Sequence, residues 1–187
     1  MKYVTHTKDR GLVLAPKDLW STRYSFKIHG RSDSDYATNP DDRRSISGGR
    51  VFVNSMPICF RSVTQKFVTL SVTEAEIAPG VMVAQDMLYM YCLLESLELK
   101  VELPMVLEMD NSNSVDIANS WSVGGRMRHV DVCNYFLCKL KDQGLLVIRH
   151  IAGESKDADI FTKNVMSTVF NRNIPLYVGD DQYVSMH

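Results

Sequence analysis

Residues 24–54 read YSFKIHGRSDSDYATNPDDRRSISGGRVFVN, and this stretch decides how the chain is interpreted. Tyr24 to Ile28 alternate in polarity as a strand does. The polar run that follows contains two turn signals, Asn39-Pro40-Asp41 and Gly48-Gly49. The residues from Arg50 to Asn54 are again rich in strand formers. We therefore expect one strand to enter a loop that carries Asp33 and a second strand to leave it.

Further along, the apolar pattern changes from strands to helices and back. A helix is predicted from Thr73 to about Leu97, because Val83, Met87, Met90 and Leu94 recur at spacings of three and four. The other expected elements are strands at 58–62, 66–71, 105–109 and 145–151, and helices at 113–119, 129–141 and 157–163. This order predicts an α/β domain that has a mixed sheet with helices on its faces.

Composition limits the possible functions. The chain has 187 residues, 45% of them hydrophobic, which suits a single domain with one core. The net charge of -1 provides no general attraction for nucleic acid, so local patches and bound metal would have to hold it. The four cysteines do not have zinc-site spacing and are expected to be reduced. No apolar signal core and no stretch of about 18 apolar residues is evident, which predicts a soluble, intracellular chain without a membrane partner.

Four acidic residues lie at the ends of predicted strands or at the starts of predicted helices. Asp33 lies at the end of the first strand, Glu76 in the first turn of the long helix, Asp110 at the end of the 105–109 strand, and Asp159 at the start of the last helix. If the first and fourth strands are neighbours, these side chains converge at one edge of the sheet. Converging carboxylates need a hard cation such as Mg²⁺ or Mn²⁺, and two such ions suit phosphodiester hydrolysis. Spacing alone leaves scattered surface acids as the alternative.

Several segments resemble the ribonuclease H domain of copia-type retrotransposon Pol polyproteins. GRSDSDYATNPDDRRSISG is similar to G-Y-S-D-A-D-W-A-G-D-x-D-x-R-R-S-T-S-G, and SVTQKFVTLSVTEAEI to S-x-K-Q-x-x-V-A-L-S-S-T-E-A-E-Y. MDNSNSVDIAN resembles C-D-N-x-x-A-I-x-L-A, GGRMRHVDV resembles R-x-K-H-I-D, and ADIFTK matches without change. YVTHTKDRGLVL resembles the tether that follows the family's reverse transcriptase. These motifs occur in the family's order and span residues 2–165.

The resemblance implies a ribonuclease H fold, a mixed five-stranded sheet with helices on both faces, and cleavage of the RNA strand of RNA–DNA hybrids with two Mg²⁺ or Mn²⁺ ions. It makes Asp33, Glu76, Asp110 and Asp159 the catalytic metal ligands. Asp33 would bridge both ions, and Asp159, rather than Asp157 or Asp116, occupies the A-D-I position. Glu74 is the other choice for the helix ligand, and Asp35 is a candidate for a supporting role.

Basic residues near these motifs are candidates for contacts with the hybrid: Arg43, Arg44, Arg126, Arg128 and His129. Arg43 and Arg44 could equally pair with Asp41 and Asp42 inside their loop. His129 could equally pair with Asp131 or simply make hydrogen bonds at the start of the predicted helix. His150 is interpreted as a packed core histidine, and no residue at 153–155 matches the catalytic-loop histidine of cellular ribonucleases H.

One departure from the family pattern affects the expected site. Pro79 lies inside the long helix, where it removes a backbone donor, so Glu76 is expected to be at risk of displacement. No Y-x-D-D polymerase motif is present, which leaves a non-catalytic interaction scaffold as the rival function. The expected organisation is a tether-like segment at 1–23, a ribonuclease H-like domain at 24–165 and a tail at 166–187. The expected location is the cytoplasm, or a virus-like particle for an active element, with a reverse transcriptase upstream in a longer polyprotein.

Overall fold

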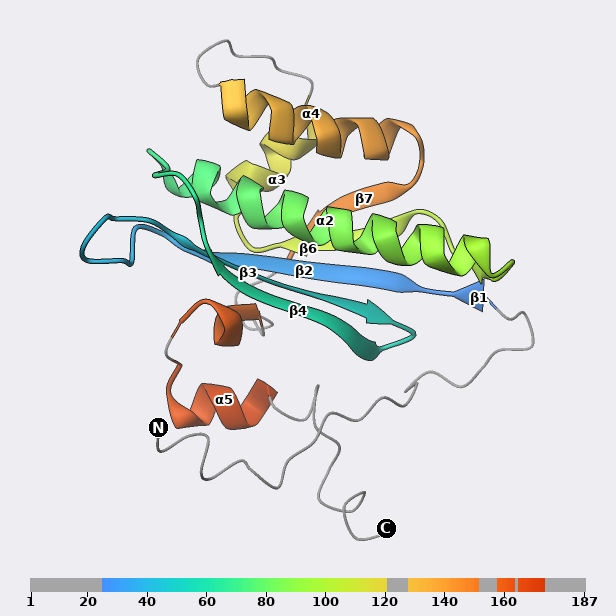
Figure 1. Cartoon of the computed structure of the whole chain (residues 1–187), viewed down its shortest axis with the longest axis horizontal. Coiled ribbons are helices and arrows are strands. Elements are labelled where there is room, and N and C mark those ends of the chain that lie inside the picture. Colours follow the sequence, from blue (N-terminus) through green and yellow to red (C-terminus); the bar gives the residue numbers. More distant parts are fainter. Residues whose placement is uncertain (1–24, 121–127, 152–157, 164, 174–187) are drawn as a thin grey trace, which may run out of the picture.

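The computed structural model describes residues 25–120, 128–151, 158–163 and 165–173. A five-stranded sheet with the order β4-β3-β2-β6-β7 forms its centre (Figure 1). Strands β2, β3 and β4 are antiparallel neighbours, and β6 and β7 run parallel to β2. Two short strands, β1 (Ser25–Phe26) and β5 (Lys100–Val101), pair in parallel beside it. The predicted mixed five-stranded sheet is confirmed.

The first two long strands extend further than the sequence indicated. Strand β2 covers Ile28–Asp35 and β3 covers Ile46–Val53, and Asp33 pairs with Gly48 within their ladder. Asp33 therefore lies near the end of the first strand, as predicted, and the strand continues to Asp35 through residues that were expected in the loop. Strand β4 covers Met56–Thr64, whereas the predicted strand at 66–71 is absent.

Helix α2 (Val72–Ser96) packs along one face of the sheet. A Cβ atom at Gly30 would overlap the fully buried Val83 and Met87 of this helix, and one at Gly49 would overlap Val83. By length and composition alone α2 is also sufficient to span a membrane, so the expectation that no such stretch exists was wrong. Its packing against β2, β3 and α4 is that of a core helix.

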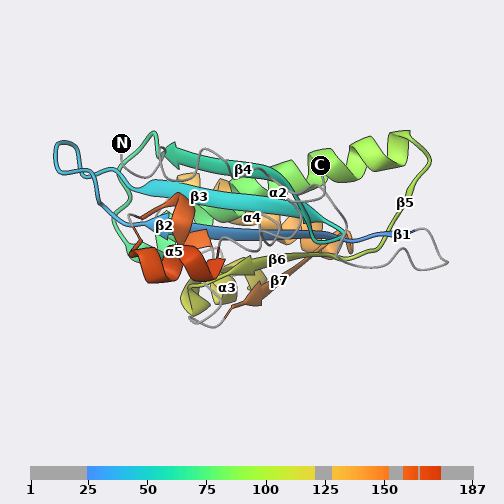
Figure 2. The ribbon, with the colours of Figure 1, turned by 90° about the horizontal axis from the view of Figure 1, so that it is seen from below.

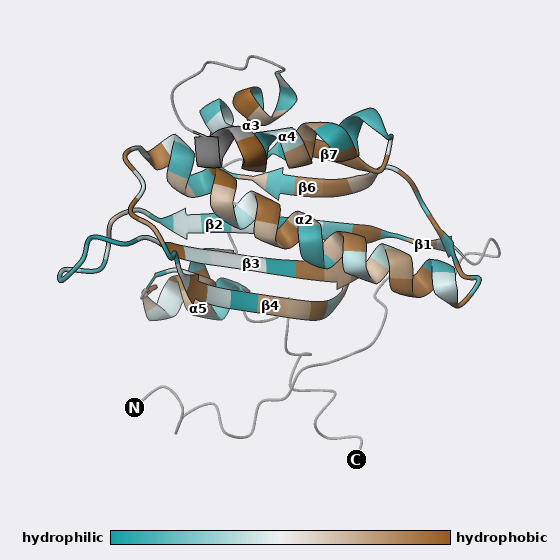
Figure 3. Ribbon diagram, turned by 45° about the horizontal axis from the view of Figure 1, so that its top comes forward, coloured by the Kyte–Doolittle hydropathy of each residue, from teal (hydrophilic) through white to brown (hydrophobic). Residues whose placement is uncertain are grey.

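The second half of the chain completes the core. Strand β6 (Met105–Met109) is followed by helix α3 (Ser112–Asn119), helix α4 (Arg128–Asp142) and strand β7 (Leu146–His150). The α4 residues Leu137 and Leu140 join Met105, Leu107 and Leu146 in one apolar cluster with the buried residues of α2. In Figure 3 the hydrophilic residues of β2 and β6 gather at the arrowheads of these strands, next to the start of α2.

The opposite face of the sheet carries the 3₁₀ helix η2 (Ala158–Phe161) and helix α5 (Ser167–Asn173) (Figure 2). A Cβ atom at Gly48 would meet Thr162 and Phe161, whereas one at Gly49 would meet Val83 of α2. Neighbouring residues of a strand point to opposite faces, so η2 and α2 lie on different sides of the sheet. The expected helices on both faces are confirmed.

Candidate active site

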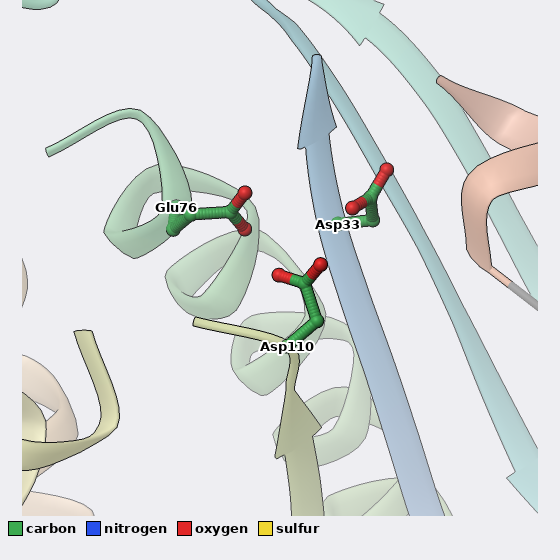
Figure 4. Close-up of side chains that lie close together, drawn as sticks. All are labelled: Asp33, Glu76 and Asp110. Atoms are coloured by element: carbon green, nitrogen blue, oxygen red, sulfur yellow. The ribbon is translucent and has the colours of Figure 1, made fainter. Parts of the chain in front are cut away.

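Three acidic side chains from different parts of the chain meet at one edge of the sheet. Asp33, Glu76 and Asp110 each offer a carboxylate oxygen, and these oxygens all lie within 4.8 Å of one another (Figure 4). Asp33 and Glu76 are buried, with relative exposures of 2% and 4%, and Asp110 is half-buried. The structure thus brings together three of the four carboxylates that the sequence predicted.

Strand pairing places the two aspartates side by side. Ser32 pairs with Met109 in the parallel ladder of β2 and β6, so the next residues, Asp33 and Asp110, occupy adjacent positions at the carboxyl ends of the two strands. Such ends are where α/β sheets present ligand-binding residues. Glu76 reaches them from α2, whose first turns pass over the same edge (Figure 4).

The structure distinguishes the two glutamates at the start of α2. Glu74 completes the helix cap: its backbone N–H donates to Ser71 Oγ at 3.2 Å, and its Oε2 accepts from the Leu70 N–H at 2.7 Å. Glu76 instead points to the carboxylate cluster, and its Oε1 accepts a hydrogen bond from Ser34 Oγ at 2.8 Å. Glu76 is therefore the helix residue at the site.

Pro79 does not displace Glu76. Helix α2 runs continuously through Pro79, and the ring is among the fully buried side chains. The adjacent Gly80 lies against Met109, because a Cβ atom there would be 3.0 Å from the Met109 methyl carbon. This close approach sets α2 near the end of β6, where Asp110 follows Met109. The expected displacement was wrong.

Asp159 lies outside this cluster and is linked to it by a lysine. Lys163 Nζ is 3.1 Å from Asp159 Oδ1 and 3.4 Å from Asp33 Oδ2. Thr162 Oγ1 also donates to Asp33 Oδ2, and it lies 3.3 Å from the Asp159 carbonyl oxygen. Asp33 thus stands between Glu76 and Asp110 on one side and the Lys163–Asp159 pair on the other.

Burial and mutual repulsion favour the protonated forms of the cluster. Burial, reinforced by the Asp110 and Asp33 carboxylates, raises the pKa of Glu76 to about 8. Burial also raises the pKa of Asp33 to about 6, although the Thr162 hydrogen bond and Lys163 oppose this shift. One oxygen of each residue, Asp33 Oδ1 and Glu76 Oε2, is buried without a hydrogen-bond partner among the described residues. Buried oxygens of this kind suit a hard divalent cation, so the residues fit the expected metal.

The predicted basic residues are not gathered at the cluster in the part of the chain that the structure describes. Arg44 Nε pairs with Asp42 Oδ2 at 3.2 Å, which is the loop pairing considered above, and Arg43 is exposed at a positive φ of 58°. Arg126 lies outside the described residues. Arg128 and His129 begin α4, and their side chains also lie outside the described part.

His150 differs from its predicted role as a packed core residue. It is exposed at the end of β7, and its Nε2 lies 3.0 Å from the backbone oxygen of Asp110. Strand β7 ends here at the same edge as β6, since Met109 pairs with His150. His150 is not a core residue because β7 is an edge strand of the sheet and its last residue is open to solvent. Asp35, the candidate for a supporting role, is half-buried at the last residue of β2.

Three residues that contact the carboxylates were not singled out from the sequence: Ser34, Thr162 and Lys163. Ser34 follows Asp33 directly, and Thr162 and Lys163 end the ADIFTK segment. Their hydroxyl and amino groups are common surface chemistry, so only the exact match of ADIFTK to the family motif could have drawn attention to the last two.

Gly48 should control how closely η2 approaches Asp33. A Cβ atom at this position would overlap the Thr162 methyl group and lie 3.1 Å from Phe161 Cβ. Gly48→Ala is expected to push Thr162 and Lys163 away from Asp33 and to weaken Mn²⁺ binding about tenfold, measured by calorimetric titration. The unfolding temperature should fall by only a few degrees, because η2 contributes little to the core.

Gly49→Ala is the matched control for this change. Its Cβ atom would overlap Val83 on the other face and separate α2 from the sheet, so it should lower the unfolding temperature much more than Gly48→Ala does. Equal destabilisation by both variants, or unchanged Mn²⁺ binding in Gly48→Ala, would contradict the role assigned to the Gly48 contact.

Comparison with known proteins places this geometry in context. No protein-family model matches the chain. The chain is 28% identical over 170 residues to the retrovirus-related Pol polyprotein from transposon RE1 of Arabidopsis thaliana, which covers 91% of this chain and 11% of the polyprotein. The RE2 polyprotein of the same plant is 27% identical over 170 residues, with the same coverage. The chain thus spans about a tenth of the length of these relatives.

Solved structures show the fold. LC11-RNase H1, isolated from compost by a metagenomic approach, superposes with a TM-score of 0.56 at 16% identity, covering 77% of this chain and 98% of that one. The same protein in complex with an RNA/DNA hybrid gives a TM-score of 0.54 at 14% identity, covering 77% and 99%. The chain is therefore homologous to the retrovirus-related Pol polyproteins of plant transposons, and its domain has the ribonuclease H fold.

Proposed function

We propose that this chain is the ribonuclease H domain of a copia-type retrotransposon, which hydrolyses the RNA strand of RNA–DNA hybrids with divalent cations. The observation that carries the proposal is the buried cluster of Asp33, Glu76 and Asp110 at the carboxyl ends of β2 and β6. Burying three carboxylates together costs free energy unless a cation or protons neutralise them. Binding of divalent cations would offset this cost, and it would give the buried cluster a function.

Each residue of the site would have a distinct role in hydrolysis. Asp33, Glu76 and Asp110 would hold one cation, and Asp33 and Asp159 would hold a second. Divalent ions, when bound, activate a water molecule for attack on the phosphodiester and stabilise the leaving oxygen. Ser34 and Thr162 orient the carboxylates of Glu76 and Asp33 through the hydrogen bonds described above. Lys163 keeps Asp159 beside Asp33 by pairing with both.

The substrate and setting are part of the same proposal. LC11-RNase H1 has been solved with an RNA/DNA hybrid, and the relatives in plants are Pol polyproteins. We infer that this chain acts on a hybrid and that a reverse transcriptase precedes it in a longer polyprotein, in the cytoplasm or a virus-like particle. Residues 24–165 would form the nuclease domain, with the tether at 1–23 and the tail at 166–187.

Cleavage of a labelled hybrid tests this function. The purified chain is expected to cut the RNA strand of an RNA–DNA duplex in Mg²⁺ or Mn²⁺, and EDTA should stop the reaction. Double-stranded DNA and single-stranded RNA of the same sequence should remain intact under these conditions. A folded chain that binds Mn²⁺ but leaves the hybrid uncut would instead support the non-catalytic scaffold.

A further inference from the structure

Pro79 leaves one carbonyl group of α2 without its usual partner. In an α-helix the N–H of each residue donates to the carbonyl oxygen four residues earlier, and proline has no N–H. The carbonyl that loses its donor here belongs to Ala75, the residue immediately before Glu76. The Ala75 side chain has 0% exposure, so this part of the helix is packed away from solvent. A buried carbonyl needs another donor.

Gln65 supplies that donor. Its side-chain Nε2 donates to the Ala75 carbonyl oxygen at 2.9 Å and to Ser47 Oγ at 2.9 Å. Only the amide nitrogen can face a carbonyl oxygen, so the chemistry fixes the orientation of the amide. Gln65 is itself buried, with 6% exposure, and its backbone N–H donates to the Ser45 carbonyl at 2.8 Å. The side chain is therefore held from β3 and points into the first turns of α2.

We propose that Gln65 is a positioning residue for Glu76, because it replaces the backbone hydrogen bond that Pro79 removes. The Gln65 bond fixes the peptide that precedes Glu76, and Ser34 fixes the carboxylate itself. Together they hold Glu76 toward Asp33 and Asp110. The role of Gln65 in hydrolysis rests on the proposed function, whereas the hydrogen-bond replacement does not depend on it.

The replacement makes Gln65 and Pro79 interdependent. Gln65→Met keeps the length of the side chain but loses the donor, so the Ala75 carbonyl becomes a buried acceptor without a partner. Pro79→Ala restores a backbone N–H four residues after Ala75. In that background the helix itself can satisfy the carbonyl, and the glutamine becomes less important. A residue that only filled space would show no such dependence.

The experiment is a double-mutant cycle on the whole chain, with Gln65→Met, Pro79→Ala and the double variant. Gln65→Met is expected to lower the unfolding temperature by about 5 °C and to weaken Mn²⁺ binding, followed by calorimetric titration, about tenfold. In the Pro79→Ala background the same substitution should change Mn²⁺ affinity by less than about threefold. Gln85→Met is the matched control, since Gln85 is exposed on the same helix and its replacement should leave both readouts unchanged.

The outcomes separate this proposal from the proposed function. Equal losses from Gln65→Met in both backgrounds, or no loss in either, would overturn the positioning role. If Gln65→Met does not fold but the double variant does, the proposal is supported. If neither folds, amide exchange in the unmodified chain decides: slow exchange of the two Gln65 Nε2 protons supports it, and exchange at the rate of solvent-exposed amides overturns it. A chain that binds no Mn²⁺ and cuts no hybrid would refute the proposed function, and the unfolding temperatures would still decide the hydrogen-bond replacement.

Discussion

Asp33→Asn is expected to abolish cleavage of an RNA–DNA hybrid while the chain remains folded. Asp33 lies beside Glu76 and Asp110 in the cluster, and its carboxylate also contacts Lys163 and Thr162. The amide keeps the shape of the side chain but loses the charge that holds cations. Single-turnover cleavage in Mg²⁺ should fall at least about 10³-fold, which corresponds to roughly 4 kcal/mol of transition-state stabilisation.

Stability gives the same variant a second readout. Because burial and neighbouring carboxylates raise the pKa of Asp33, its charge is unfavourable in the metal-free fold. Asp33→Asn should therefore raise the unfolding temperature in EDTA at pH 8, while Mg²⁺ should stabilise it less than it stabilises the unmodified chain. Asp142→Asn is the control: Asp142 is exposed at the end of α4, outside the cluster, and its replacement should keep activity within about threefold. Hybrid cleavage by Asp33→Asn at the normal rate would exclude Asp33 as a ligand.

The elements with a strong apolar period were predictable from the sequence. The long helix expected from Thr73 to about Leu97 is α2, Val72–Ser96, and the strand at 105–109 is β6 without change. Strand β2 was not predicted to its end because its outer half, Ser32 to Asp35, consists of polar residues. That half is buried between α2 and η2, so its polar side chains face other parts of the protein and not a solvated loop. Local polarity does not reveal such tertiary burial.

The candidate site also contains features that were predictable from the sequence and features that were not. The positions of Asp33 and Asp110 at two parallel strand ends follow from the predicted elements, and the resemblance to the retrotransposon family favoured Glu76. Contacts that depend on tertiary packing could not be predicted from the sequence. They join Gln65 to the Ala75 carbonyl, Lys163 to Asp33, and His150 to the Asp110 carbonyl. The sequence suggested that Pro79 would displace Glu76, because the side chain that replaces the missing N–H of Pro79 belongs to Gln65, which lies before the helix.

The second large effect is a loss of metal-free stability as the pH rises. The pKa of Glu76 is raised to about 8 and that of Asp33 to about 6, so the folded chain holds protons that the unfolded chain releases at lower pH. Stability from these groups is present at acid pH and is lost as the pH rises through about 6 and then about 8. A tenfold change in proton affinity corresponds to about 1.4 kcal/mol, so the total loss should reach several kcal/mol.

Thermal unfolding at pH 5, 7 and 9, in EDTA and in saturating Mg²⁺, measures this effect. In EDTA the unfolding temperature should fall by about 10 °C between pH 5 and 9, and Mg²⁺ should restore most of the loss at pH 9 and almost none at pH 5, because it binds the charged carboxylates. Glu76→Gln should remove most of the decline above pH 7 and most of the effect of Mg²⁺, since the amide does not titrate. The two proteins differ only at residue 76, so the difference between their pH dependences isolates the contribution of Glu76. If the two proteins show the same pH dependence in EDTA, Glu76 does not carry the buried charge that the proposed metal site requires.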